Sequence, residues 1–187
     1  MTGERVPPGQ KVIERFPRLD LGIIPKFDEN KWRLRIEGSV ENPVVLTYKE
    51  VLELGQTTVV SDFHCVTGWS RLDNKWEGIL FKTIITLVHP KQDVKYVTVL
   101  SGDGYSTSLP LSELMGEDVL LALSLDGKSL TAEHGGPLRL IVPQKYGYKS
   151  AKWVQMIKFT VQKELGYWEE RGYSDTADPW TEDRYSR

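Results

Sequence analysis

The chain has 187 residues, of which 40% are hydrophobic and 27% charged, and its formal net charge is −2. This length and composition are typical of one soluble globular domain, and the balanced charge gives no reason to expect a nucleic acid or an anionic membrane as the main partner. A single cysteine excludes an internal disulfide and a cysteine-rich zinc site.

The first residues carry neither the apolar segment of a signal peptide nor a twin-arginine pair. No apolar run approaches the about 18 residues that are needed to span a bilayer. One unpaired cysteine suits a reducing compartment. We therefore predict a cytoplasmic protein without membrane insertion.

Residues 1–30 are predicted to form an extended arm that wraps over the body, because four prolines fix φ and interrupt helices there. Residues 31–38 alternate between apolar and charged side chains, which predicts a half-buried strand that ends at Gly38. Residues 47–54 begin with Thr47 and Glu50 at capping-box spacing and predict a short helix.

The central part of the chain predicts one strand and one helix. Residues 57–66 are β-branched and aromatic enough for a strand, with Val59, Phe63 and Cys65 on one side. Residues 79–88 are apolar with helical spacing and stop before His89-Pro90.

The remaining segments predict strands. Asp126-Gly127 has the sequence of a hairpin turn, and in the last strand Trp153, Ile157, Phe159 and Val161 are expected to point inward. The predicted strands lie in 94–100, 103–110 (after a turn), 117–130, 137–143 and 152–162.

Many short strands with a few short helices predict an α+β fold: one β-rich mixed domain that spans residues 1–187. Residues 166–187 form a charged tail that is nevertheless rich in aromatic residues, unlike a disordered tail. We expect the tail to pack on the body, with its aromatic side chains as anchors: Tyr167, Trp168, Tyr173, Trp180 and Tyr185.

Cys65 is the first candidate for chemistry. A buried structural role is the commonest one for a cysteine. A nucleophile activated by His64 would suffer from strand geometry, because neighbouring strand residues point to opposite faces, and zinc would need further ligands at short spacing. A single soft thiolate ligand to a metal that a cofactor brings needs a cysteine at a strand end beside a glycine turn, and Gly68 provides that turn.

Two further segments could bind or position a ligand. Residues 134–153 combine clustered basic side chains, glycines and a serine, which can neutralise and bind a phosphate. The P-loop spacing is missing, so a solvated basic loop remains an equal alternative. Two glycines around Asp103 form a turn that presents Tyr105 at its exit, and an ordinary turn would do the same.

Together these segments resemble the molybdopterin-binding domain of the sulfite oxidase family, and its small stand-alone bacterial and archaeal members most closely. The matching stretches are HCVTGWSRLDNKWEG, SGDGYSTSLPL, DVLLALSLDGKSL and HGGPLRLIVPQKYGYKSAKWV. They occur in the family's order and extend from about Trp32 to about Trp168. One departure is that CVTGWSR stands where the animal enzymes have Cys-x-Gly-Asn-Arg, with Trp69 in place of the asparagine and Arg71 one position later than the arginine would then be.

The resemblance implies roles for individual residues. Cys65 matches the metal ligand, Tyr105 matches the active-site tyrosine, and Arg71 could offset negative charge on the substrate. The positions that would bind molybdopterin and its phosphate are Asp103, His134, Arg139, Lys149, Ser150 and Lys152.

The implied function is that of a molybdenum–molybdopterin oxidoreductase that transfers an oxygen atom, as in sulfite oxidase. It would use a small-molecule acceptor or donor and a separate electron carrier. The alternatives are a sulfoxide or N-oxide reductase of the same fold, a non-catalytic molybdopterin-binding carrier module and, more distantly, a cysteine hydrolase.

Overall fold

The computed structural model describes residues 5–186; Met1–Glu4, the start of the expected arm, and Arg187, the end of the expected tail, lie outside the described residues. The strands are β1 (Lys11–Val12), β2 (Arg33–Gly38), β3 (Val44–Thr47), β4 (Thr57–Cys65), β5 (Trp69–Leu80), β6 (Tyr96–Ser101), β7 (Ser106–Pro110), β8 (Leu120–Leu125), β9 (Lys128–Ser129), β10 (Arg139–Ile141) and β11 (Val154–Thr160). The α-helices are α1 (Tyr48–Leu52) and α2 (Phe81–Val88), and the 3-10 helices are η1 (Leu111–Met115), η2 (Ala132–His134), η3 (Gly147–Lys149) and η4 (Glu169–Arg171).

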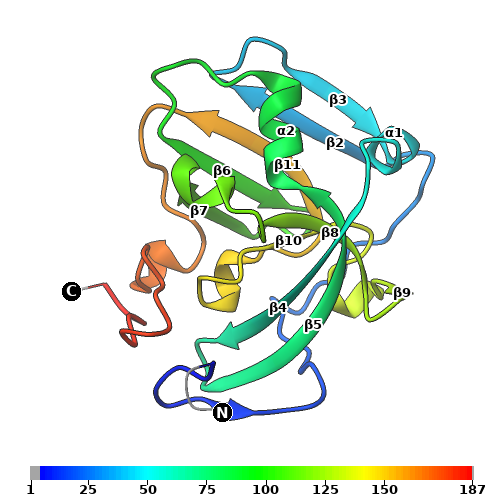
Figure 1. Cartoon of the computed structure of the whole chain (residues 1–187). Helices are drawn as coiled ribbons and strands as arrows, with labels where there is room; N and C mark the ends of the chain where they lie inside the picture. The colour runs from blue at the N-terminus through cyan, green and yellow to red at the C-terminus, as the bar shows by residue number, and fades with distance from the viewer. Residues whose placement is uncertain (1–4, 187) are drawn as a thin grey trace.

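The strands form two mixed sheets (Figure 1). One has the order β3-β2-β11-β6-β7, and the other has the path β1-β5-β8-β10 with β4 on β5 and β9 on β8. The predicted α+β, β-rich fold is therefore confirmed. No helix in residues 5–186 is long and apolar enough to cross a bilayer.

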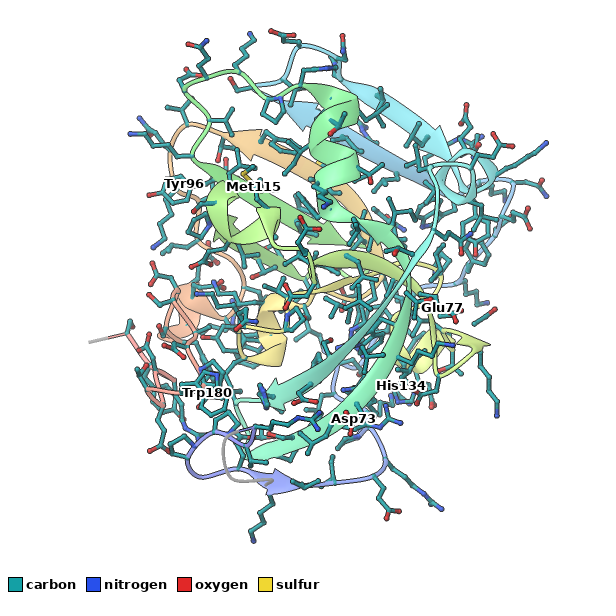
Figure 2. The ribbon with its side chains drawn as sticks, in the orientation of Figure 1. Asp73, Glu77, Tyr96, Met115, His134 and Trp180 are labelled. Carbon is teal, nitrogen blue, oxygen red and sulfur yellow. The ribbon has the colours of Figure 1, made fainter. Side chains whose placement is uncertain are left out.

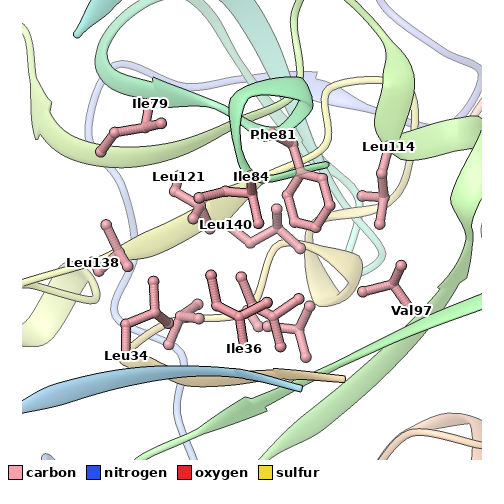
Figure 3. Packing of buried hydrophobic residues seen from close by; sticks show 14 of the residues in the cluster. Leu34, Ile36, Ile79, Phe81, Ile84, Val97, Leu114, Leu121, Leu138 and Leu140 are labelled. Carbon is pink, nitrogen blue, oxygen red and sulfur yellow. The ribbon is translucent and has the colours of Figure 1, made fainter. Parts of the chain in front are cut away.

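The main core lies where β2, β6 and β11 face α2 and the strands β8 and β10. Leu34 and Ile36 of β2 point toward Ile84 of α2, Leu121 of β8 and Leu140 of β10 (Figure 3), and all five side chains are inaccessible to solvent. The alternation that predicted β2 is thus the pattern of its buried and exposed faces.

Local signals in the sequence placed the two helices. The Thr47–Glu50 capping box is formed in both directions and starts α1. The helix predicted at 79–88 begins later, at Phe81, because Ile79 and Leu80 pair with β8 and belong to β5. His89 ends α2 in the left-handed region, with φ of 48°.

Residues 69–78, for which no element was predicted, form most of β5. β4 and β5 make a long two-stranded ribbon that extends from the rest of the fold (Figure 1). Cys65 pairs with Trp69 at the tip of this ribbon, and the turn between them includes Gly68 with φ of 95°. The cysteine therefore ends a strand in a tight hairpin.

Both ends of the described chain pack against this ribbon. The arm contributes only β1, which pairs with β5 at Trp69 and Ser70. In the tail, Tyr167, Trp168 and Tyr173 are half-buried, whereas Trp180 and Tyr185 are 43% and 62% exposed. Trp180 still packs on the His64 ring of the body, so the expectation of an anchor was wrong for Tyr185 alone, whose ring packs on Tyr173 of the tail itself. Val161 was also wrongly placed inward, because β11 ends at Thr160 and Val161 is 39% exposed.

Candidate active site

A cavity of about 280 Å³ opens beside the tip of the β4–β5 ribbon. Its walls come from that tip, the β6–β7 turn, η2, the start of β10 and the segment after η3, and the arm and the tail close it. Seven of the nine predicted site residues line it: Cys65, Asp103, Tyr105, His134, Arg139, Ser150 and Lys152. Residues from five separate stretches of the sequence thus meet at one place.

Cys65 is held firmly at the ribbon tip. It is 6% exposed, and its Sγ lies 3.1 Å from the Thr67 hydroxyl. Its carbonyl accepts from Gln10 Nε2 at 3.1 Å, and the next carbonyl, that of Val66, accepts from Arg184 in the tail. Burial raises the pKa of the Cys65 thiol, which the Thr67 hydroxyl and then the charge of Arg139 partly offset.

His64 is not placed to activate Cys65. Its Nδ1 pairs with Ser70 Oγ at 2.8 Å, its ring packs on Trp180, and burial lowers its pKa. This geometry weighs against the hydrolase alternative. No group of three or more His, Cys, Asp or Glu side chains that could hold a metal ion occurs in residues 5–186.

Arg139 is a buried cation that lines the cavity, and its charge acts on the Cys65 thiol. It is 7% exposed, Nη1 donates to the His134 carbonyl at 3.1 Å, and the guanidinium lies 5.1 Å from the Phe63 ring centre. Nε has no hydrogen-bond partner within residues 5–186. Burial lowers the pKa of Arg139 to about 10, so it is still charged at neutral pH. A buried unpaired donor on a cation is costly, and an anionic ligand would satisfy it.

Lys152 adds a second positive charge to this wall. Its Nζ donates to the Glu133 carbonyl at 3.0 Å and lies 4.2 Å from the Trp153 ring centre. Burial, followed by repulsion from Arg139, lowers the pKa of Lys152 to about 8. Two cations so close together favour a shared anion between or beside them.

Three other predicted site residues already have protein partners. His134 pairs through Nδ1 with Thr131 Oγ1 at 2.9 Å, and its Nε2 lies 3.4 Å from the Phe16 carbonyl of the arm. Ser150 Oγ accepts from the Val142 amide at 3.0 Å. Asp103 accepts from the Tyr105 amide at 3.0 Å and so fixes the β6–β7 turn.

Tyr105 presents a protonated hydroxyl. It donates to the Tyr148 carbonyl, and its burial, followed by the negative charge of Glu169, raises the pKa of Tyr105 well above the usual value. It can therefore serve as a hydrogen-bond donor at all ordinary pH values and not as a base.

Arg71 and Lys149 do not line the cavity. Arg71 donates to Asp126 at 2.5 Å and to the Glu14 carbonyl at 2.9 Å, and it stacks 5.1 Å from Phe16. Lys149 is fully buried, donates to the Ser108 carbonyl at 3.0 Å and forms an ion pair with Glu169. The two side chains to which the resemblance gave contacts with substrate and phosphate are thus bound to protein partners and are not among the lining residues of the cavity.

The residues that close the cavity were not among the predicted site residues. The arm contributes Phe16 and Asp20, and the tail contributes Trp168 and Tyr173. The aromatic content of the tail was a signal that it packs on the body, but nothing in the pattern showed which ring would reach a site around Cys65.

Comparisons with known proteins show the family of the chain. Residues 21–168 match the family model described as "Oxidoreductase molybdopterin binding domain". The "Uncharacterized oxidoreductase YuiH" of Bacillus subtilis (strain 168) is 40% identical over 183 residues, which are 97% of this chain and 92% of that protein.

Two further relatives are longer than this chain. The "Putative protein-methionine-sulfoxide reductase subunit YedZ1" of Azospira oryzae is 36% identical over 151 residues, covering 81% of this chain and 57% of that protein. The solved structure of the sulfane dehydrogenase SoxCD from Paracoccus pantotrophus superposes with a TM-score of 0.70 at 22% identity, over 84% of this chain and 46% of that chain. This last likeness shows a shared fold.

Proposed function

The chain belongs to the oxidoreductase molybdopterin binding domain family, and from this premise we propose that it reduces a neutral sulfoxide or N-oxide by oxygen-atom transfer. The chain is a molybdopterin-dependent oxidoreductase, and its cofactor is molybdopterin with molybdenum. We propose the roles of the site residues, the class of substrate and the direction of the reaction.

The cavity fits this cofactor. The sulfur of Cys65 and the cationic side chains of Arg139 and Lys152 line the same cavity, and Arg139 Nε has no hydrogen-bond partner within residues 5–186. We propose that Cys65 binds the metal as a thiolate and that Arg139 and Lys152 neutralise the anionic pterin phosphate. When it is bound, the cofactor supplies two-electron oxygen-atom transfer chemistry.

The protein's own residues would then orient the substrate and limit its contact with water. Trp168, Tyr173 and Phe16 line the cavity with apolar ring surface, which strengthens polar interactions inside. Tyr105 lines the same cavity and keeps its proton, so after turning from the Tyr148 carbonyl it could donate to a substrate oxygen.

One observation favours a neutral substrate over sulfite. Arg71, which would have attracted an anion, is held by Asp126 outside the cavity. The cavity is instead bordered by the carboxylate of Asp103, which forms no ion pair within residues 5–186 and repels anions. The bordering carboxylates of Asp20 and Glu133 are paired with Arg18. If Arg139 and Lys152 serve the phosphate, no lysine or arginine among the described lining residues remains for a sulfite ion. The relative named as a sulfoxide reductase subunit supports the same choice.

The test is to make the protein in a host that synthesises molybdopterin and to measure molybdenum per chain and the thiolate-to-metal absorption. Loaded enzyme should oxidise reduced viologen with dimethyl sulfoxide, methionine sulfoxide or trimethylamine N-oxide, and the Cys65→Ser variant should not. Faster turnover of sulfite with ferricyanide than of any sulfoxide or N-oxide would overturn the choice of substrate. Cytoplasmic location and a separate electron carrier remain proposals, and cell fractionation tests the first.

A further inference from the structure

A continuous series of aromatic rings leads from the cavity to solvent through the tail. Tyr105 packs on Tyr167 at 5.8 Å between ring centres, and Tyr167 packs on Trp168 at 5.2 Å. Trp168 then packs on Tyr173 at 5.0 Å, and Tyr173 packs on Tyr185 at 5.2 Å. Tyr105, Trp168 and Tyr173 line the cavity, whereas Tyr185 is 62% exposed. Along this line two packed rings, Tyr173 and Tyr185, separate the cavity from solvent.

This part of the tail is fixed in place. Tyr173 and Tyr185 lie opposite each other in a short antiparallel bridge, and the Ser174 amide donates to the Arg184 carbonyl at 3.0 Å. The Tyr148 hydroxyl donates to the Ser174 carbonyl, which joins the tail to η3. Backbone and side-chain bonds therefore hold the rings in contact without a ligand.

The proposed reaction moves two electrons that must enter from another protein. The single cysteine is the proposed metal ligand, so the chain has no thiolates for an iron–sulfur cluster. Electron tunnelling weakens exponentially with distance and more steeply across gaps than through packed atoms. An electron carrier that touches Tyr185 would thus be separated from the cavity by the packed rings of Tyr173 and Tyr185.

The outer surface of the tail has the composition of a docking site. Trp180 is 43% exposed and lies on the tail at the edge of the molecule (Figure 2). Tyr185 is 62% exposed, so the tail presents two large aromatic side chains to solvent. Residues 166–186 contain six carboxylates and two arginines. Lys149 and Lys163 of the body neutralise Glu169 and Asp175, and the two arginines of the tail pair with Glu170 and Glu182. Asp178 and Asp183 form no ion pair within residues 5–186, so the tail keeps an excess of negative charge. Residues 169–186 also lie beyond the family match.

We propose that this tail face, formed by Glu170, Tyr173, Trp180, Glu182 and Tyr185, is the docking site of a small one-electron carrier protein with a positively charged face. The inference rests on the proposed oxidoreductase function and adds the entry point and the chemistry of the partner. Each encounter passes one electron, so two encounters complete one turnover. A sulfoxide then takes up two electrons and two protons from water and leaves as the sulfide and water. The rings serve as packed contacts and are not oxidised.

The test uses holoenzyme that has been reduced with dithionite and mixed in a stopped-flow instrument with an oxidised, lysine-rich c-type cytochrome. Reduction of the haem should slow with rising salt. Tyr185→Ala and Trp180→Ala should each slow it and weaken cytochrome binding about five-fold or more, and Glu170→Lys should flatten the salt dependence. Met115→Ala, at an apolar residue of η1 that is 56% exposed, and Glu41→Lys are the matched controls and should change neither quantity.

Two further measurements separate the possible failures. A small quinone acceptor reports whether the cofactor can be reoxidised, and binding of the cytochrome to cofactor-free protein reports docking alone. If quinone and cytochrome both react but no sulfoxide or N-oxide does, the proposed substrate fails and the docking face survives. If the quinone reacts while Tyr185→Ala, Trp180→Ala and Glu170→Lys match the controls, or an acidic flavodoxin-type carrier binds more tightly than the cytochrome, the docking face is refuted.

Discussion

The buried ion pair between Lys149 and Glu169 yields a prediction that separates structural from cofactor-binding roles. The exposed fractions of the two side chains are 0% and 2%, and Lys149 has one further acceptor, the Ser108 carbonyl. Burial lowers the pKa of Lys149, which attraction to Glu169 partly offsets. The Lys149→Met substitution keeps the volume of the side chain, but it leaves the buried carboxylate of Glu169 without its cation. Breaking such a pair from one side costs about 3–5 kcal/mol.

The expected loss is large enough for a simple assay. For a protein of this size, 1 kcal/mol corresponds to about 2–4 °C in Tm, so Lys149→Met should melt roughly 6–20 °C lower. Urea unfolding of cofactor-free protein gives the free energy directly. The matched control is Lys158→Met, which breaks the pair with Glu164, where the exposed fractions are 40% and 39%. That change should cost about 1 kcal/mol or less.

The double variant completes the cycle. Lys149→Met with Glu169→Met removes both charges, and the remaining cost is the Ser108 carbonyl without its donor, about 1–3 kcal/mol. The double variant should therefore be more stable than Lys149→Met alone. If Lys149→Met unfolds like Lys158→Met but loses molybdenum, Lys149 binds the phosphate as the resemblance implied, and the structural role is refuted.

Three further predictions concern the cavity. Cys65→Ser should keep its Tm but lose the thiolate-to-metal absorption and turnover, and a fully active serine variant would disprove ligation by Cys65. Arg139→Met removes a buried cation whose Nε is unpartnered within residues 5–186. Cofactor-free protein of this variant should melt at the same or a higher temperature, while the molybdenum content per chain falls. A lower Tm would mean that the charge stabilises the fold. The pKa of Lys152 is lowered to about 8, so the side chain is protonated and positively charged below that pH and neutral above it. Binding of sulfate to cofactor-free protein should weaken as pH rises through about 8, and this step should be missing in Lys152→Met.

The parts of the fold that could be predicted from the sequence depend on residues close together in the chain. Thr47 and Glu50 form a capping box, and Asp126-Gly127 forms a hairpin turn with φ of 52° and 75°. β5 could not be predicted in this way. Asp73 interrupts it with φ of 54°, and pairing with β4 and β8 makes it a strand although its own alternation is poor.

The candidate site shows the same division. The resemblance gathered seven residues that do line one cavity, because the order of motifs carries the fold. The surroundings of Arg71 and Lys149 could not be predicted, because their partners, Asp126 and Glu169, are 55 and 20 residues further along the chain. Composition can identify a basic loop. Whether the amine of Lys149 in η3 lines the cavity or pairs with Glu169 depends on tertiary packing.

The position of Cys65 is likewise set by segments remote in sequence. Gln10 of the arm binds its carbonyl, Arg184 of the tail binds the next one, and the Lys11 amide donates to the Gly68 carbonyl at 2.9 Å. A hairpin tip is ordinarily among the more mobile parts of a sheet. Here both ends of the described chain brace the turn, so the sulfur is oriented before a cofactor arrives and less ordering is left for binding to supply. The tail that would receive the electron carrier therefore also holds the proposed metal ligand in place.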